Sequence, residues 1–226
     1  MLEKMDSLER IRDEIIDCRK CPRLVVWRES VAVEKRASFA HEEYWGRPVP
    51  GFGDPSASLV IVELAPAAHG GNRTGRVFTG DRSGGWFFRA LHKAGFANQP
   101  SSRSGADGLQ LYDAYVSAVV RCAPPSNKPS VAKRNTCIPY LERELAELGA
   151  ARVIIALGRF AQAAIARMAG IRPRPRFRHG VEGPLPDGRT LICSYHPSQQ
   201  NTFTGKLTEE IFEAVFRRAR VLIAEH

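Results

Sequence analysis

A glycine-rich loop carries the densest set of chemically capable side chains in the sequence. The apolar, β-branched run before it predicts a buried strand, and the loop at residues 64–81 holds four glycines between positions 70 and 80. Glycine lets the backbone approach a ligand, and open α/β sheets bind ligands where such loops follow strands. An ordinary strand-to-helix connection is the plainer alternative, but it needs no such inventory of side chains as His69, Asn72, Arg73, Thr74, Phe78 and Asp81.

Four of the five cysteines fall into two pairs that could bind a metal. Cys18 and Cys21 have the C-x2-C spacing that places two sulfurs within reach of one metal, and Cys122 and Cys137 form a looser pair. Four thiolates suit zinc or a [4Fe–4S] cluster equally, and unrelated buried cysteines are the remaining alternative. A metal here would tie the N-terminal helix to the end of the second strand. Cys193 lies in an apolar run, so we interpret it as a core residue.

Alternating strands and helices are expected to position these residues. This pattern predicts an α/β fold, a three-layer α/β/α sandwich with a central, mainly parallel four-stranded sheet. We expect one domain over residues 1–226, in which residues 1–57 supply a helix, the first cysteine pair and a wrapping loop, and residues 58–226 form the α/β core. The expected strands are 58–64, 114–120, 153–157 and 190–194; the expected helices are 6–17, 83–95, 130–148, 159–170 and 208–224; residues 28–57 and 97–108 are expected to be irregular.

The carboxyl ends of parallel strands lie on one edge of a sheet, so four polar or Gly/Pro-rich segments should meet there. Their convergence favours a ligand site more strongly than any one loop does. These segments are 64–81, 121–129, 158–160 and 195–206.

Composition indicates a polyanionic partner. The net charge is +9 and the isoelectric point is about 9.7, which is typical of nucleic-acid-binding domains, although a generally basic solvated surface is the alternative. No apolar run is long enough for a transmembrane helix, and the polar, acidic start lacks a signal-peptide core. We therefore expect a cytoplasmic protein whose cysteines bind metal rather than form disulfides.

The four segments and the cysteine pattern together resemble the uracil-DNA glycosylase superfamily, most closely its fifth family, the type B enzymes. The resemblance spans residues 18 to about 210. It implies the α/β/α glycosylase fold, a [4Fe–4S] cluster on the four paired cysteines, and excision of uracil and related deaminated bases from double-stranded DNA, which leaves an abasic site. A monomer associated with the nucleoid through DNA is the matching expectation. The resemblance is carried by residues 64–76 with 78–81, 120–125 with 127–129, 156–159, and 195–198 with 200–202.

The implied reaction hydrolyses the bond between the base and the sugar after the nucleotide has left the duplex. By resemblance, His196 donates to uracil O2, and a structural histidine is its alternative. Asp81 positions water or stabilises the sugar cation, and it could also cap the helix near residue 83. Asn127 orients water or contacts the substrate, with an Asx turn as its alternative.

The resemblance also implies the residues that hold the base and the DNA. Phe78 would stack on the flipped base, unless it is ordinary core. The other base-binding residues would be Leu64, Ala65, Ala67 and Asn72. The residues expected to bind DNA are Arg73, Arg76, Gln200, Asn201 and Lys206, each of which could instead be a plain surface group.

The chain departs from the family at one position, because Glu63 stands where the family usually has glycine. Leu64 and Ala65 occupy the turn where other branches carry Asp, Asn or Glu, in agreement with the fifth family. Two further functions stay open. One is a non-catalytic binder of damaged DNA whose pocket Glu63 has altered, and the other is a zinc-stabilised nucleic-acid-binding domain unrelated to repair.

Overall fold

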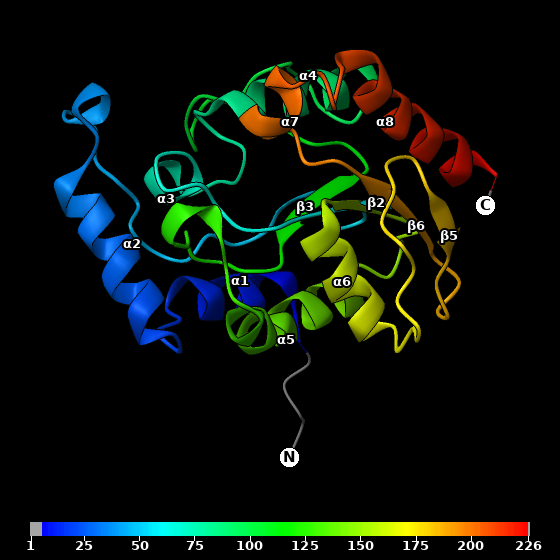
Figure 1. The fold of residues 1–226 in the computed structure, drawn as a ribbon, viewed down its shortest axis with the longest axis horizontal. Helices are drawn as coiled ribbons and strands as arrows, with labels where there is room; N and C mark the ends of the chain where they lie inside the picture. Colours follow the sequence, from blue (N-terminus) through cyan, green and yellow to red (C-terminus); the bar gives the residue numbers. More distant parts are fainter. Residues whose placement is uncertain (1–5, 226) are drawn as a thin grey trace.

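The computed structural model describes residues 6–225 and shows a six-stranded sheet between two layers of helices (Figure 1). The four central strands run parallel, and a short antiparallel strand lies at each edge, in the order β1-β3-β2-β4-β6-β5. The strands are β1 (Phe52–Gly53), β2 (Leu59–Glu63), β3 (Ala114–Ala118), β4 (Val153–Leu157), β5 (Glu182–Pro184) and β6 (Thr190–Ser194).

The α/β/α architecture and the four parallel strands are confirmed, but the four-stranded sheet is too narrow. The sequence analysis missed β1 and β5, because each has only two or three residues and is defined by its antiparallel partner. Pro184 fits the outer position of β5, since an edge strand does not need every backbone N–H for pairing.

Helices α4 and α8 cover one face of the sheet, and α1, α5 and α6 cover the other (Figure 1). None of the helices within residues 6–225 is long and apolar enough to cross a membrane. The helices are α1 (Leu8–Ile16), α2 (Pro22–Glu34), α3 (Gly71–Thr74), α4 (Arg82–Lys93), α5 (Val131–Glu147), α6 (Arg159–Met168), α7 (Gln199–Phe203) and α8 (Glu209–Ala224), with short 3₁₀ turns at Ala37–Phe39 and Pro125–Asn127.

Helix α2 corrects the expectation that residues 28–57 are irregular, because it continues to Glu34. Pro22 occupies its first turn, where a missing N–H is harmless. Leu24, Val25 and Val31 face the interior at helical spacing. The prolines and glycines further along the segment had hidden this periodicity.

Buried side chains alternate between the two faces of the central strand β2. Leu59 and Ile61 join the core under α4 and α8, whereas Val60 and Val62 join the core under α5 and α6. Because both faces are covered, every residue of β2 is buried.

The order of the strands also determines where the functional site forms. From β2 the chain crosses to β3 on one side, and it returns to β4 on the other side of β2. This reversal opens a crevice at the carboxyl end of β2, which is where doubly wound sheets bind their ligands.

Candidate active site

A pocket of about 600 Å³ lies at the carboxyl edge of the sheet. The loops after β2, β3 and β6 supply its walls, as the sequence analysis predicted. The predicted segment 158–160 does not line the pocket, although Gly158 is near His196, since a Cβ built on it would lie 3.8 Å from the Cβ of His196. The predicted site residues that line the pocket are Leu64, Ala65, Ala67, Phe78, Asp81, Asn127, His196 and Gln200.

Phe78 is held in the pocket wall by a strained backbone. Its φ angle is +55°, an unusual value for a bulky residue. Its ring stacks on Phe87 at 4.2 Å between centroids, and Gly84 is essential beneath it, because a Cβ there would lie 1.8 Å from the Phe78 carbonyl oxygen. Strain of this kind is typical of functional sites, and the packing on Phe87 makes Phe78 both a core residue and a pocket residue.

Asp81 faces the pocket from the start of α4. Its Oδ1 accepts a hydrogen bond of 2.8 Å from the Gly84 N–H, which confirms the helix cap. Its Oδ2 lies so close to Gly70 that a Cβ there would be 2.2 Å away. Burial raises the pKa of Asp81, while the Gly84 N–H and nearby His196 favour the charged form.

His196 lies opposite, in the loop after β6. Asn201 holds this turn, since its Nδ2 donates to the His196 carbonyl oxygen at 2.8 Å. The imidazole ring is 5.5 Å from the Phe78 ring. Burial lowers the pKa of His196 to about 4, although Asp81 opposes this shift, so the imidazole is neutral at pH 7 and can donate one N–H.

Glu63 ends β2 at the floor of the pocket and is only 3% exposed. Its Oε2 is 3.5 Å from Nε2 of His196. Burial, and then the nearby Asp81, raise the pKa of Glu63 well above its ordinary value, and Arg121 opposes them. The sequence predicted Glu63 as a departure from the family that could alter the pocket, but it was not counted among the catalytic or base-binding residues.

Asn127 lines the pocket from the exit of β3 and is exposed. Ser126 and Asn127 have φ angles of +53° and +54°, and asparagine tolerates this conformation better than most residues. The Asn127 N–H donates to the Pro124 carbonyl oxygen at 3.1 Å. The turn and the site are therefore compatible.

Asn72 and Arg73 do not reach the pocket or the surface. Asn72 is completely buried, and its Nδ2 donates to the Arg28 carbonyl oxygen at 3.1 Å, so its predicted contact with the base does not fit the structure. Arg73 is 5% exposed, pairs with Glu42, and donates to the Gly80 carbonyl oxygen at 2.9 Å. It holds the glycine-rich loop together instead of facing DNA phosphates.

Arg76 is buried in the same way, which corrects its predicted contact with DNA. Its guanidinium donates to Asp107 at 2.5 Å and to Ser102 at 2.6 Å, and it thereby anchors the polar loop at 97–108. Burial would raise the pKa of Asp107, but the hydrogen bonds from Arg76 and from backbone N–H groups lower it to about 2.

Exposed side chains lie at the mouth of the pocket. Arg82 and Lys128 line the pocket, and Arg82 lies over the ring of Phe203 at 4.5 Å. Phe203, on α7, is 64% exposed, and Lys206 lies over Tyr195 at 4.5 Å. Arg82 and Ser83 were not predicted, although they directly follow the glycine-rich loop. Ser126, Ser198, Gln199 and Phe203 lie in the segments that were predicted to meet at the site, but they were not named as site residues.

The four paired cysteines converge on one enclosed cavity. Arg28 lines it too, and its Nη1 donates to Cys122 Sγ at 3.0 Å, so the cavity has the positive charge that thiolate ligands require. As the side chains stand, no three metal-binding groups within residues 6–225 are close enough together to hold a metal ion. The donor set fits a metal centre, while the choice between zinc and a cluster stays a prediction.

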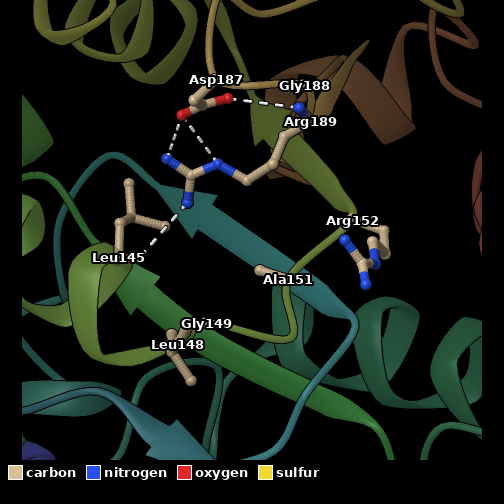
Figure 2. A pocket seen from close by; sticks show the side chains of 8 residues that line it. All are labelled: Leu145, Leu148, Gly149, Ala151, Arg152, Asp187, Gly188 and Arg189. Carbon is tan, nitrogen blue, oxygen red and sulfur yellow. Dashed lines mark hydrogen bonds and ion pairs between the residues drawn. The ribbon is translucent and has the colours of Figure 1, made fainter.

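A second hollow, of about 260 Å³, lies at the opposite edge, beside the amino ends of β4 and β6 (Figure 2). Two of its charged side chains, Arg189 and Asp187, pair with each other. The Arg189 Nε donates to Asp187 Oδ2 at 2.9 Å, and its Nη1 donates to the Leu145 carbonyl oxygen at 3.3 Å. The pocket at the carboxyl edge is the better candidate, because polar atoms there stay available to a ligand.

The fold and the pocket define a doubly wound α/β enzyme whose pocket brings together an aromatic ring, a neutral imidazole and a carboxyl group. Comparison with known proteins agrees. The family model for the uracil-DNA glycosylase superfamily matches residues 50–220. A type-5 uracil-DNA glycosylase of Mycobacterium leprae is 52% identical over 219 residues, which cover 96% of each chain.

Two further relatives support the same assignment. A type-5 uracil-DNA glycosylase of Thermus thermophilus is 52% identical and covers 91% of this chain and 93% of its own. A type-5 uracil-DNA glycosylase of Pyrobaculum aerophilum is 42% identical, and the match covers 92% of this chain and 89% of its own. The chain belongs to the uracil-DNA glycosylase superfamily, and within it to the type-5 family.

Proposed function

We propose that this protein is a DNA-repair hydrolase that removes uracil and related deaminated bases from double-stranded DNA. The observation that carries the proposal is the pocket in which Phe78, Asp81 and His196 face one space at the carboxyl edge of the sheet. Its volume of about 600 Å³ accommodates a flipped nucleotide, and duplex DNA must extrude its base before such a pocket can act.

Each residue has a defined task in this proposal. Phe78 stacks on the flipped base, and the neutral His196 donates its N–H to uracil O2, where negative charge develops as the base leaves. Asp81 carries negative charge beside the sugar, which becomes cationic, and directs the attacking water. Asn127 orients that water from the other wall.

The mouth of the pocket supplies the contacts to DNA. Phe203 is an exposed aromatic side chain on α7, and it suits the gap that a flipped base leaves in the duplex. Gln200 lines the pocket beside it, and Arg82, Lys128 and Lys206 provide exposed positive charge for phosphates. Double-stranded DNA is therefore the proposed partner, a monomer is the proposed acting unit, and the nucleoid is its proposed location.

The cysteine cavity is proposed to hold a [4Fe–4S] cluster on Cys18, Cys21, Cys122 and Cys137. When bound, the cluster would supply a rigid link among segments that are distant in sequence. The cysteines follow α1, begin α2, follow β3 and lie within α5, so their joint ligation would fix the N-terminal helices to the sheet. A brown anaerobic preparation with iron and sulfide supports the cluster, whereas a colourless protein with one zinc contradicts it.

The function is tested by incubating the protein with duplex DNA that contains uracil opposite guanine, followed by alkali. Cleavage at the uracil position is expected, because alkali breaks the strand at abasic sites. Intact strands would refute the proposed excision.

Binding of damaged DNA without catalysis is the second candidate function, and the position of Glu63 beside His196 is the observation that favours it. In that case uracil-containing duplex would bind without releasing base, and Glu63→Gly would restore release.

A further inference from the structure

The carboxyl of Glu63 is buried at the floor of the pocket with one of its oxygens unused. Oε2 lies 3.5 Å from His196 Nε2, whereas Oε1 is buried and has no hydrogen-bond partner among the described residues. A buried polar atom without a partner costs folding free energy, and native proteins rarely keep one unless it has a use. Glu63 lines the pocket, so a rotation of its carboxyl would bring Oε1 to a ligand bound there.

The charges around Glu63 favour its neutral form. Asp81, from the loop after β2, faces it with negative charge. Arg121, at the exit of β3, is committed to Glu144, to which it donates at 2.5 Å. His196, at the exit of β6, is neutral at pH 7. Arg121 still favours the charged form of Glu63, but burial and Asp81 outweigh it. The remaining charges on the pocket lining are at its mouth, on Arg82 and Lys128.

We propose that Glu63 is a base-contacting residue of this enzyme, and that its carboxyl binds the edge of the flipped base. This inference rests on the proposed function. A neutral carboxyl offers one donor and one acceptor, and a base with an N–H beside a C=O, such as uracil or hypoxanthine, is complementary to both.

The same contact assists departure of the base. When water forms its bond to C1′, it gives a proton to the Asp81 carboxylate. As the glycosidic bond breaks, its electron pair stays on the base, and negative charge spreads to the base oxygens. An O–H in a dry pocket stabilises this charge and keeps its own proton, whereas an ionised carboxylate would repel it. Glu63 should therefore work only while it is protonated.

The test is the single-turnover rate of uracil release from duplex DNA, measured from acidic to alkaline pH for wild type, Glu63→Gln and Glu63→Leu. Glutamine keeps a neutral donor and acceptor, so it should keep most of the rate at low pH and remove the alkaline loss that Glu63 causes. Leucine keeps the size but has no polar atom, and it should lower the rate about 10²-fold. Gly85→Ala, whose Cβ would contact nothing within 4 Å, should keep the wild-type profile.

The outcomes separate this inference from the proposed function. Suppose that the wild type releases uracil, but Glu63→Leu is equally fast or Glu63→Gln keeps the alkaline loss. Then only the role of Glu63 is overturned, and the proposed function stands. A wild type without uracil release at any pH overturns the proposed function as well. If Glu63→Leu does not fold, infrared spectroscopy decides. The wild type should show the carbonyl band of a protonated carboxyl, and this band should shift when free uracil is added. The band should be absent in Glu63→Gln. A wild type that lacks the band at neutral pH refutes the inference.

Discussion

Replacing Asp81 with serine separates the two roles that the structure gives this residue. The carboxylate faces the pocket, and its Oδ1 also accepts the 2.8 Å hydrogen bond that caps α4. Serine is as good a helix cap as aspartate but carries no charge. Asp81→Ser should therefore keep the stability of the protein and lose its chemistry.

The size of each effect follows from the contact that is lost. Asp81→Ala removes the cap, which should cost about 1 kcal/mol and lower the melting temperature by about 2–4 °C for a domain of this size. Both variants remove a carboxylate from the reacting sugar, which should slow catalysis by about 10²–10⁴-fold. Asp81→Asn, which caps and has the same shape, should behave as the serine variant does.

Two measurements test the prediction together: thermal melting, and single-turnover release of uracil from duplex DNA. We expect Asp81→Ser to melt close to wild type and to be as slow as Asp81→Ala. An active Asp81→Ser would refute a chemical role for the carboxylate. A serine variant as unstable as the alanine variant would refute the cap argument.

Three further predictions concern other parts of the site. Gly70→Ala places a Cβ 2.2 Å from Asp81 Oδ2, where ordinary contacts begin at 3.4 Å, so the carboxylate must move by about 1 Å and turnover should fall about 10²-fold. The control variant Gly85→Ala should have no effect, because its Cβ would contact nothing within 4 Å. Equal activity of both variants would contradict this geometry. Phe203→Ala should lower kcat/KM on duplex DNA about tenfold, because one aromatic contact to the bases is lost. The melting temperature should change little, because the side chain is exposed. An unchanged kcat/KM would exclude a role for Phe203 in flipping the base. The pKa of Glu63 is raised in the folded state, so this group contributes stability at low pH that is lost as the pH rises from about 4.5 towards the folded-state pKa. In that range, the free energy of unfolding of Glu63→Gln should gain up to about 1.4 kcal/mol per pH unit over that of wild type, measured by denaturation. A difference that does not change with pH would show that Glu63 is ionised.

The central strands and the pocket could be predicted because their signals are local. Runs such as Val153–Leu157 are apolar and β-branched, and they became buried parallel strands over the predicted residues. The carboxyl ends of such strands share one edge, so the loops that carry Phe78, Asp81 and His196 had to meet. The placement of these side chains followed from topology, while their roles stay predictions.

The errors have one physical origin, which is that the partners lie far away in the sequence. Strand β1 exists because it pairs with β3, about 60 residues further along the chain. Arg73 and Arg76 look like surface charges, but Glu42 and Asp107 draw them into the interior. Long-range ion pairs of this kind leave no pattern in a single sequence. The protonation of Glu63 is equally invisible there, because it depends on burial and on its neighbours.

Mass spectrometry of the products from uracil-containing duplex DNA tests the central claim most directly. We expect free uracil together with a full-length strand that has lost only its base and that breaks on treatment with alkali. An unchanged strand that remains bound to the protein would contradict it.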